Sequence, residues 1–131
     1  MAGRLVALDL PGGPGFVDAL RRAWDRGDAV LPIDRRLPRP AVATLLGRLG
    51  VALVVDADGE HRFAEGAPVE PGDALVVTTS GSSGEPKGVV LTHDAVRASA
   101  VATSSRLGVT AGDHWLACLP LAHVGGLSVV T

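Results

Sequence analysis

Short apolar runs alternate along this chain with stretches in which apolar residues recur every three or four positions. Residues 5–8, 29–31 and 52–55 are continuous apolar runs of strand length, which indicates strands buried on both faces. The stretches between these runs predict two helices, marked by Phe16, Val17, Leu20 and Trp24 after Pro14, and by Val42, Leu45, Leu46 and Leu49 after Pro40. The alternation of strands and helices predicts an α/β fold, a mostly parallel sheet flanked by helices.

The second half of the chain continues this pattern. Residues 56–59 read Asp-Ala-Asp-Gly and predict a hairpin turn, so residues 61–63 are expected to form a short return strand. Residues 75–77 and 89–91 predict two strands around a polar loop, and residues 114–119 predict a last strand. A third helix is expected over residues 94–107, with Thr92 as its N-cap, Gly108 at its end, and a face that packs on the sheet through Val96, Ala100, Thr103 and Leu107.

The polar loop between the two later strands concentrates hydroxyls, glycines and one ammonium group. Its hydroxyls belong to Thr78, Thr79, Ser80, Ser82 and Ser83. Glycines let the backbone approach an anion closely, and successive N–H groups in such a turn form an anion-binding concavity. Lys87 is the only lysine among the 12 Lys and Arg residues, and a compact ammonium suits a phosphate oxygen. The loop therefore predicts a phosphate-binding site.

A solvated turn or a linker is the alternative interpretation of so polar a loop. The apolar runs directly before and after the loop argue against a linker, because they hold it between two predicted strands. A Walker-type phosphate loop is excluded, since that loop has glycine before its lysine and Ser or Thr after it. Here Lys87 stands between Pro86 and Gly88.

Residues 79–88 resemble the signature loop of the adenylate-forming superfamily, [ST]-S-G-[ST]-[ST]-G-x-P-K-G, at every position. This superfamily contains acyl- and aryl-CoA synthetases, luciferases and the adenylation domains of peptide synthetases. The resemblance implies that the loop holds the outer phosphates of ATP while a substrate carboxylate attacks the α-phosphorus, which gives acyl-AMP and pyrophosphate. The implied phosphate-contacting residues are Thr79, Ser80, Gly81, Ser82, Ser83, Gly84 and Lys87, and Lys87 is also the implied catalytic residue.

Two further stretches resemble the same superfamily. Residues 27–38 resemble the upstream element G-A-x-x-x-P-L-D-P-x-x-P, with Arg35 in place of the usual proline. Because strand–turn–helix strings of this kind are common, the sequence favours a structural role for this element. Residues 119–127 contain Pro120 and His123 and resemble the P-L-x-H-x-x-G segment of the acyl pocket. The resemblance implies that His123 serves the carboxylic acid or CoA, whereas a lone histidine in an apolar run is otherwise a core residue.

The resemblance also sets expectations for the whole enzyme. It implies an ATP-dependent acid–thiol ligase that uses ATP, Mg²⁺ and CoA, with the magnesium ligands mostly outside this chain. Residues 1–131 are then expected to be a partial N-terminal AMP-binding domain, truncated at its C-terminal end and completed by the missing part of the same enzyme. The short region before the loop resembles that of o-succinylbenzoate-CoA ligases. The alternatives are an inactive stand-alone nucleotide- or acyl-binding module, or an unrelated α/β protein that binds another phosphorylated ligand.

The composition of the chain argues against several classes of partner. A formal net charge of −2 and 3% aromatic residues argue against nucleic acid, which binds basic surfaces and aromatic platforms. No apolar run reaches the roughly twenty residues of a membrane span, and no pair of histidines has metal-ligand spacing. Cys118, the single cysteine, is expected to be a small buried hydrophobe in a reducing compartment, so we expect a cytoplasmic protein.

Overall fold

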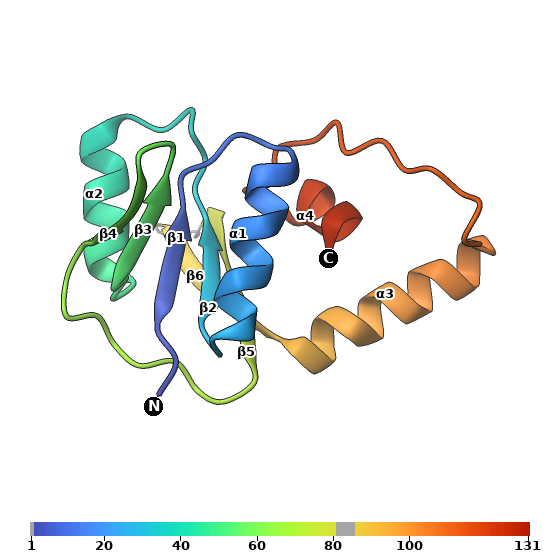
Figure 1. The fold of residues 1–131 in the computed structure, drawn as a ribbon, viewed down its shortest axis with the longest axis horizontal. Helices are drawn as coiled ribbons and strands as arrows, with labels where there is room; N and C mark the ends of the chain where they lie inside the picture. Colours follow the sequence, from blue (N-terminus) through green and yellow to red (C-terminus); the bar gives the residue numbers. More distant parts are fainter. Residues whose placement is uncertain (1, 81–85) are drawn as a thin grey trace.

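The computed structural model describes residues 2–80 and 86–131. Over these residues the chain forms a six-stranded sheet in the order β4-β3-β1-β2-β5-β6 (Figure 1). The strands are β1 (Leu5–Leu8), β2 (Ala29–Pro32), β3 (Leu53–Asp56), β4 (Gly59–Arg62), β5 (Asp73–Ser80) and β6 (Pro86–Thr92). The helices are α1 (Pro14–Asp25), α2 (Arg39–Arg48), α3 (His93–Leu107) and α4 (Val124–Val130).

The four central strands are parallel and the two edge strands are antiparallel. β1 pairs in parallel with both β2 and β3, and β2 pairs in parallel with β5. β4 and β6 each return by a hairpin from the preceding strand. The predicted α/β sheet is therefore confirmed, including the short return strand, which begins at Gly59 instead of His61.

Both faces of the central strands are covered, which explains why their sequences are continuously apolar. Along β1, Val6 and Leu8 pack into a cluster with Phe16 and Leu20 of α1. The alternate residues of β1 pack on the opposite face, in a cluster that contains Leu46 of α2. Leu127 of α4 is 1% exposed and belongs to the first cluster, so α4 lies on the same face as α1.

Both predicted ends of α3 are confirmed, and Trp24 makes two contacts that the sequence did not predict. Thr92 caps α3 by accepting a hydrogen bond from the backbone N–H of Ala95 at 3.2 Å. Gly108 ends α3 in the left-handed conformation, with φ of 66°. Trp24 ties α1 to the sheet, since its indole N–H donates to the backbone carbonyl of Ala74 at 2.8 Å. The same indole meets the ring of His93 edge-on, at 4.9 Å between centroids.

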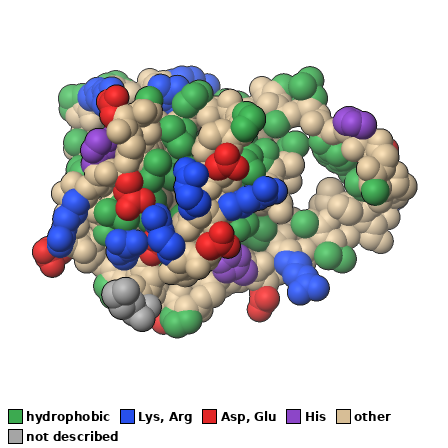
Figure 2. All heavy atoms as spheres, in the orientation of Figure 1, with side chains coloured by type: hydrophobic (Ala, Val, Ile, Leu, Met, Phe, Trp, Pro, Cys, Tyr) green, Lys and Arg blue, Asp and Glu red, His purple; other side chains and the backbone are tan. Residues whose placement is uncertain are grey.

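The predicted packing of α3 on the sheet is wrong. Only the first part of α3 reaches the core, through the half-buried Val96, whereas Leu107 is 61% exposed. After its first turns the helix leaves the sheet, and an opening separates it and the following connection from the rest of the molecule (Figures 1 and 2). Apolar side chains are therefore exposed along the connection, with Trp115, Leu116 and Leu119 among them.

Residues 114–119 also do not form the predicted last strand. They run as an irregular, exposed connection between α3 and α4, and no strand of the described residues lies beside them. A strand is stabilised by hydrogen bonds between its backbone and that of a neighbouring strand. Because no neighbouring strand is present here, the extended conformation would not be stabilised in this way. Cys118, expected to be buried, is exposed because it lies in this connection.

The upstream element at residues 27–38 carries a buried ion pair that supports a structural role. Asp28 is 2% exposed and accepts hydrogen bonds from the backbone N–H of Arg4 at 2.9 Å and from the Arg4 guanidinium at 3.1 and 3.3 Å. Arg26 donates to the same carboxylate at 3.2 Å. The Asp28 hydrogen bond raises the pKa of Arg4 further. These contacts join the start of β1, the end of α1 and the start of β2.

Within the residues that the structure describes, none of the helices has both the length and the apolar character that crossing a membrane requires.

Candidate functional site

The sequence-predicted phosphate loop is the tip of the hairpin between β5 and β6. The two strands are longer than the sequence predicts, because pairing continues from Leu75 opposite Leu91 to Ser80 opposite Pro86. Thr78 and Thr79, predicted on the loop, therefore belong to β5, and Lys87 belongs to β6. The hydrogen-bonded pairing of β5 with β6 therefore constrains the backbone of these three residues more than an open loop would.

Alternation along the strands determines which face Lys87 uses. Thr79 pairs with Lys87, so both side chains project from one face of the sheet. Val77, two residues before Thr79, packs in the cluster of α1 and α4. Thr79 and Lys87 therefore lie on the face that α1 and α4 cover. Since His123 directly precedes α4, this is also the face nearest to His123.

On the opposite face of the hairpin, side chains pack closely on Gly88. A Cβ atom placed at Gly88 would lie 2.9 Å from side-chain carbons of both Leu49 and Val76. Gly88 thus lets residues 49 and 76 close over the backbone of β6. The predicted contacts at Gly81, Ser82, Ser83 and Gly84 lie outside the described residues. Lys87 is exposed, and its side chain has no hydrogen bond or ion pair with any described residue.

A second group of polar side chains joins His123 to the turn after β2. Arg36 forms a two-point ion pair with Asp34, at 2.9 Å from Nε to Oδ1 and 2.8 Å from Nη2 to Oδ2. The same Arg36 Nη2 lies 2.9 Å from Nε2 of His123, and Asp34 Oδ2 lies 3.6 Å from that nitrogen. Arg35, at the position of the family's proline, instead pairs with Asp9 at 3.2 Å. We call Asp34, Arg36 and His123 the histidine cluster.

Two strand ends and one helix start bring this cluster together. Ile33 donates its backbone N–H to Leu8 at 3.0 Å, which extends β2 beside the end of β1 and places Asp34 at the carboxyl edge of the sheet. His123 is the N-cap of α4, where Leu127 donates its backbone N–H to the His123 carbonyl at 2.9 Å. Since β5 is parallel to β2, the hairpin tip extends from the same edge.

The pKa of Asp34 is lowered to about 2, chiefly by the side-chain hydrogen bond from Arg36 and also by the backbone N–H of Arg36. We expect Asp34 to titrate near pH 2 and Arg36→Ala to raise its midpoint toward 3.8. Because the folded-state pKa is lowered, the stability from ionised Asp34 is complete above pH about 4 and is lost as the pH falls through the folded value.

Carbon-13 NMR titration of the aspartate carboxyls measures this midpoint. Arg35→Ala is the matched control, since Arg35 pairs with Asp9 and should leave Asp34 unchanged. An Asp34 midpoint that does not move in Arg36→Ala would contradict the assignment of the ion pair.

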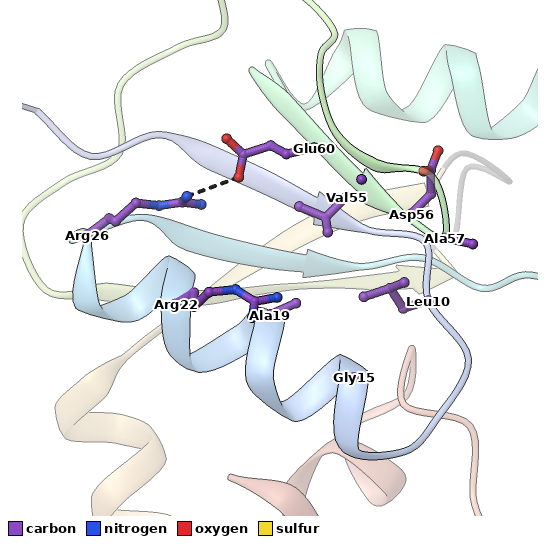
Figure 3. Close-up of a pocket in the computed structure, with 10 residues that line it drawn as sticks. Leu10, Gly15, Ala19, Arg22, Arg26, Val55, Asp56, Ala57 and Glu60 are labelled. Carbon is purple, nitrogen blue, oxygen red and sulfur yellow. Dashed lines mark hydrogen bonds and ion pairs between the residues drawn. The ribbon is translucent and has the colours of Figure 1, made fainter.

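Two hollows lie near the carboxyl ends of the strands. One, of about 180 Å³, borders the histidine cluster and is lined by residues 10–12 and 33–36, Phe16, and residues 120–122. The other, of about 340 Å³, lies between α1, β3 and β4 and contains no residue of the histidine cluster (Figure 3). Arg26 and Glu60 face each other across it at 3.0 Å, and Arg26 also pairs with Asp28. The smaller hollow is therefore the one associated with the predicted chemistry.

The sequence missed the contribution of Asp34 and Arg36 to this site. Both residues lie in the stretch whose structural role the sequence favours, and Arg36 is 87 residues from His123. The only available signal was that residues 27–38 and 119–127 resemble elements of one superfamily. The structure brings these two stretches into contact.

The architecture is that of an α/β domain whose polar residues gather at the carboxyl edge of a parallel sheet, where such domains bind their ligands. This chain belongs to the AMP-binding enzyme family, whose model matches residues 56–131. The predicted membership of the adenylate-forming superfamily and the predicted fold class are thereby confirmed.

Individual relatives cover nearly the whole chain. It is 53% identical over 147 aligned positions to the 2-succinylbenzoate–CoA ligase of Bacillus cereus, covering 98% of this chain and 30% of the ligase. It is 41% identical over 118 positions to the probable non-canonical nonribosomal peptide synthetase CymA of Salinispora arenicola, covering 86% of this chain and 2% of that protein. The chain thus spans about a third or less of these relatives.

Solved structures of an enzyme of this kind also match the fold of this chain. The o-succinylbenzoate CoA synthetase of Bacillus subtilis in complex with the acyl-adenylate OSB-AMP matches with a TM-score of 0.82 and 26% identity, over 98% of this chain and 40% of the synthetase. The same synthetase in complex with ATP and magnesium ion matches with a TM-score of 0.80 and 25% identity, over 98% and 41% of the two chains.

Proposed function

We propose that this chain is the N-terminal portion of an ATP-dependent acid–thiol ligase, with residues 1–131 as part of its AMP-binding domain. The whole enzyme activates a carboxylic acid as acyl-AMP, releases pyrophosphate and transfers the acyl group to CoA. Family membership supports this proposal, as does 53% identity to a 2-succinylbenzoate–CoA ligase. Since ATP and CoA are both available there, the cytoplasm is the compartment we propose.

The observation that carries the proposal is the pairing of Thr79 with Lys87 at the base of the signature loop. This register puts the hydroxyl and the ammonium on one face of the sheet. The ammonium is exposed and has no described partner, so it is available to an anion. A fixed cation and fixed N–H donors stabilise charge that develops in a transition state, which here is the charge of departing pyrophosphate.

The roles that we propose for individual residues rest on the resemblance of residues 79–88 and 119–127 to the superfamily elements. Thr79 and Lys87, with Ser80, Gly81, Ser82, Ser83 and Gly84 of the loop, hold the outer phosphates of ATP. His123, at the start of α4 beside the smaller hollow, serves the carboxylic acid or its transfer to CoA.

Mg²⁺ enters this proposal bound to ATP. Across residues 2–80 and 86–131, no group of three or more His, Cys, Asp or Glu side chains is placed to hold a metal ion. The described residues therefore do not fit a resident metal site, and none of them is assigned to the ion. Magnesium bound to ATP neutralises phosphate charge, while this chain supplies the hairpin and Lys87.

Acid-dependent exchange of pyrophosphate into ATP tests the proposal. The enzyme is a chimera in which residues 1–131 replace the matching part of the Bacillus cereus ligase, and 2-succinylbenzoate is the first acid to try because that relative is named for it. We expect exchange by the chimera and none by the 131-residue chain alone, which spans 30% of the ligase. A folded chimera that binds ATP but exchanges nothing with any acid would favour the inactive binding module.

For His123→Ala in the same chimera, we expect a loss in the use of the acid or CoA of about a hundredfold, at the low end for one general acid–base group. Binding of ATP should change little, because the phosphate-binding residues lie on the hairpin. The measurement is kcat/KM for acid and for CoA beside the Kd for ATP. Equal losses in all three would show that His123 only supports the fold.

A further inference from the structure

Arg36 is fixed before it reaches His123. Its guanidinium makes two hydrogen bonds to Asp34, and its backbone N–H donates to Oδ1 of the same carboxylate at 3.0 Å. The Asp34 side chain is 18% exposed. Its backbone carbonyl accepts from Leu37 at 3.0 Å, which closes the turn after β2. Although Arg36 is exposed, these hydrogen bonds therefore fix the position of its Nη2 atom.

His123 is fixed from the other side. Its backbone N–H donates to the Pro120 carbonyl at 3.1 Å, and its own carbonyl accepts the first hydrogen bonds of α4, from Gly126 at 3.1 Å and Leu127 at 2.9 Å. The ring then meets Arg36 Nη2 at 2.9 Å through Nε2. Two independently fixed segments thus meet at a single hydrogen bond.

A guanidinium can only donate hydrogen bonds, so Nε2 of His123 must be the acceptor in this contact. In a neutral imidazole the proton is then on Nδ1. We propose that Arg36, held by Asp34, is a positioning residue that fixes the orientation of the His123 ring and its Nδ1–H tautomer. The value of this tautomer for the reaction rests on the proposed function, in which the Nδ1–H group of His123 can donate a hydrogen bond to a carboxylate oxygen of the acid.

The neighbouring charges fit this role. Asp34 Oδ2 is 3.6 Å from Nε2, beyond hydrogen-bond distance, whereas it accepts from Arg36 at 2.8 Å. The carboxylate therefore bonds to Arg36, and Arg36 in turn bonds to the ring. The remaining pair at this edge, Arg35 with Asp9, is separate, since Arg35 Nε donates to Asp9 Oδ1 at 3.2 Å.

Nitrogen-15 NMR of the histidine rings of this chain tests the proposal without substrates. At a pH of about 8, where histidine is ordinarily neutral, the couplings to the ring protons identify which nitrogen lacks a proton. The signals of His123 are those that disappear in His123→Gln. We expect Nε2 to be the unprotonated nitrogen of His123, and Arg36→Ala to shift the population toward the Nε2–H form that free histidine favours in water.

Arg35→Ala is the matched control, because it removes a neighbouring arginine that pairs with Asp9, and it should leave the tautomer unchanged. Amide spectra of each variant establish that the fold is kept. Protonated Nε2 in the unmodified chain would overturn the proposal. An unchanged tautomer in a folded Arg36→Ala chain would overturn it equally.

A second measurement links the tautomer to the reaction in the chimera. We expect Arg36→Ala to lower kcat/KM for the acid about tenfold, as loss of an orienting partner does at metal-bound histidines, with the KM for ATP unchanged. If the tautomer changes while acid use does not, the assigned role of His123 fails and the positioning by Arg36 stands. If exchange is absent in every chimera, the proposed function fails, and the NMR result still decides the positioning.

Discussion

Lys87→Ala in the chimera should lower the rate of acyl-adenylate formation by about a hundredfold or more, while the affinity for ATP falls much less. Removing one electrostatic donor aimed at developing charge typically costs 10²–10³ in kcat, or about 3–4 kcal/mol. Negative charge builds on pyrophosphate as it departs, so the ammonium of Lys87 stabilises the transition state more than bound ATP. Pre-steady-state adenylation and ATP binding, measured separately, distinguish the two effects.

The fold should survive this change. The Lys87 side chain is exposed and has no described partner, and surface substitutions of that kind usually stay within about 0.5 kcal/mol. Lys87→Arg keeps the charge but presents a wider, planar group between Pro86 and Gly88, so it should recover only part of the rate. Thioester formation from synthetic acyl-AMP no longer involves pyrophosphate and serves as the internal control. Parental adenylation by Lys87→Ala, or equal loss of both half-reactions, would refute the phosphate-binding role.

Gly126→Ala should destabilise the 131-residue chain by about 1–3 kcal/mol, the usual cost of overpacking. A Cβ atom at this position would lie 2.4 Å from the Pro120 carbonyl oxygen and 2.5 Å from that of Leu119. Backbone atoms cannot rotate away as the end of a side chain can, so α4 must move. Because His123 is the N-cap of α4, the displacement should also break its contact with Arg36.

Gly125→Ala is the matched control, in the same helix and with the same gain in helix propensity of about 1 kcal/mol. Its Cβ would lie 3.3 Å from Cδ1 of Leu119, a side-chain atom that can shift. Urea unfolding of both variants gives the difference in free energy, and the nitrogen-15 spectrum reports the state of His123. Equal stabilities of the two variants would mean that α4 does not pack against residues 119–120 as described.

The sequence predicted best those elements whose local pattern and tertiary environment agree. β1 and β2 are apolar at every position because both of their faces are buried. The Thr92 cap and the Gly108 terminus of α3 depend on contacts within a few residues, so local sequence was sufficient. Thr78 and Thr79 looked like loop residues from their polarity, but cross-strand pairing with β6 extends the strand through them.

Other features depend on distant partners. The apolar run at 114–119 has strand composition, yet whether it forms a strand depends on an available neighbour, which no local pattern specifies. The helical face with Leu107 likewise has suitable spacing but no sheet beneath it. In the histidine cluster, the sequence identified His123 through a motif, whereas the contact with Arg36 arises only when β2 and α4 meet in the fold.

The pairing of Thr79 with Lys87 makes the length of β6 a determinant of activity in its own right. Consecutive strand residues point to opposite faces, so one extra residue between Lys87 and Gly88, with no bulge to absorb it, would turn the ammonium toward Leu49 and α2. Two extra residues would return it to the original face, though displaced by about 7 Å along the strand. Among natural or engineered variants of this hairpin, whether the number of inserted residues is odd or even should therefore affect activity more than the chemical nature of the inserted residues.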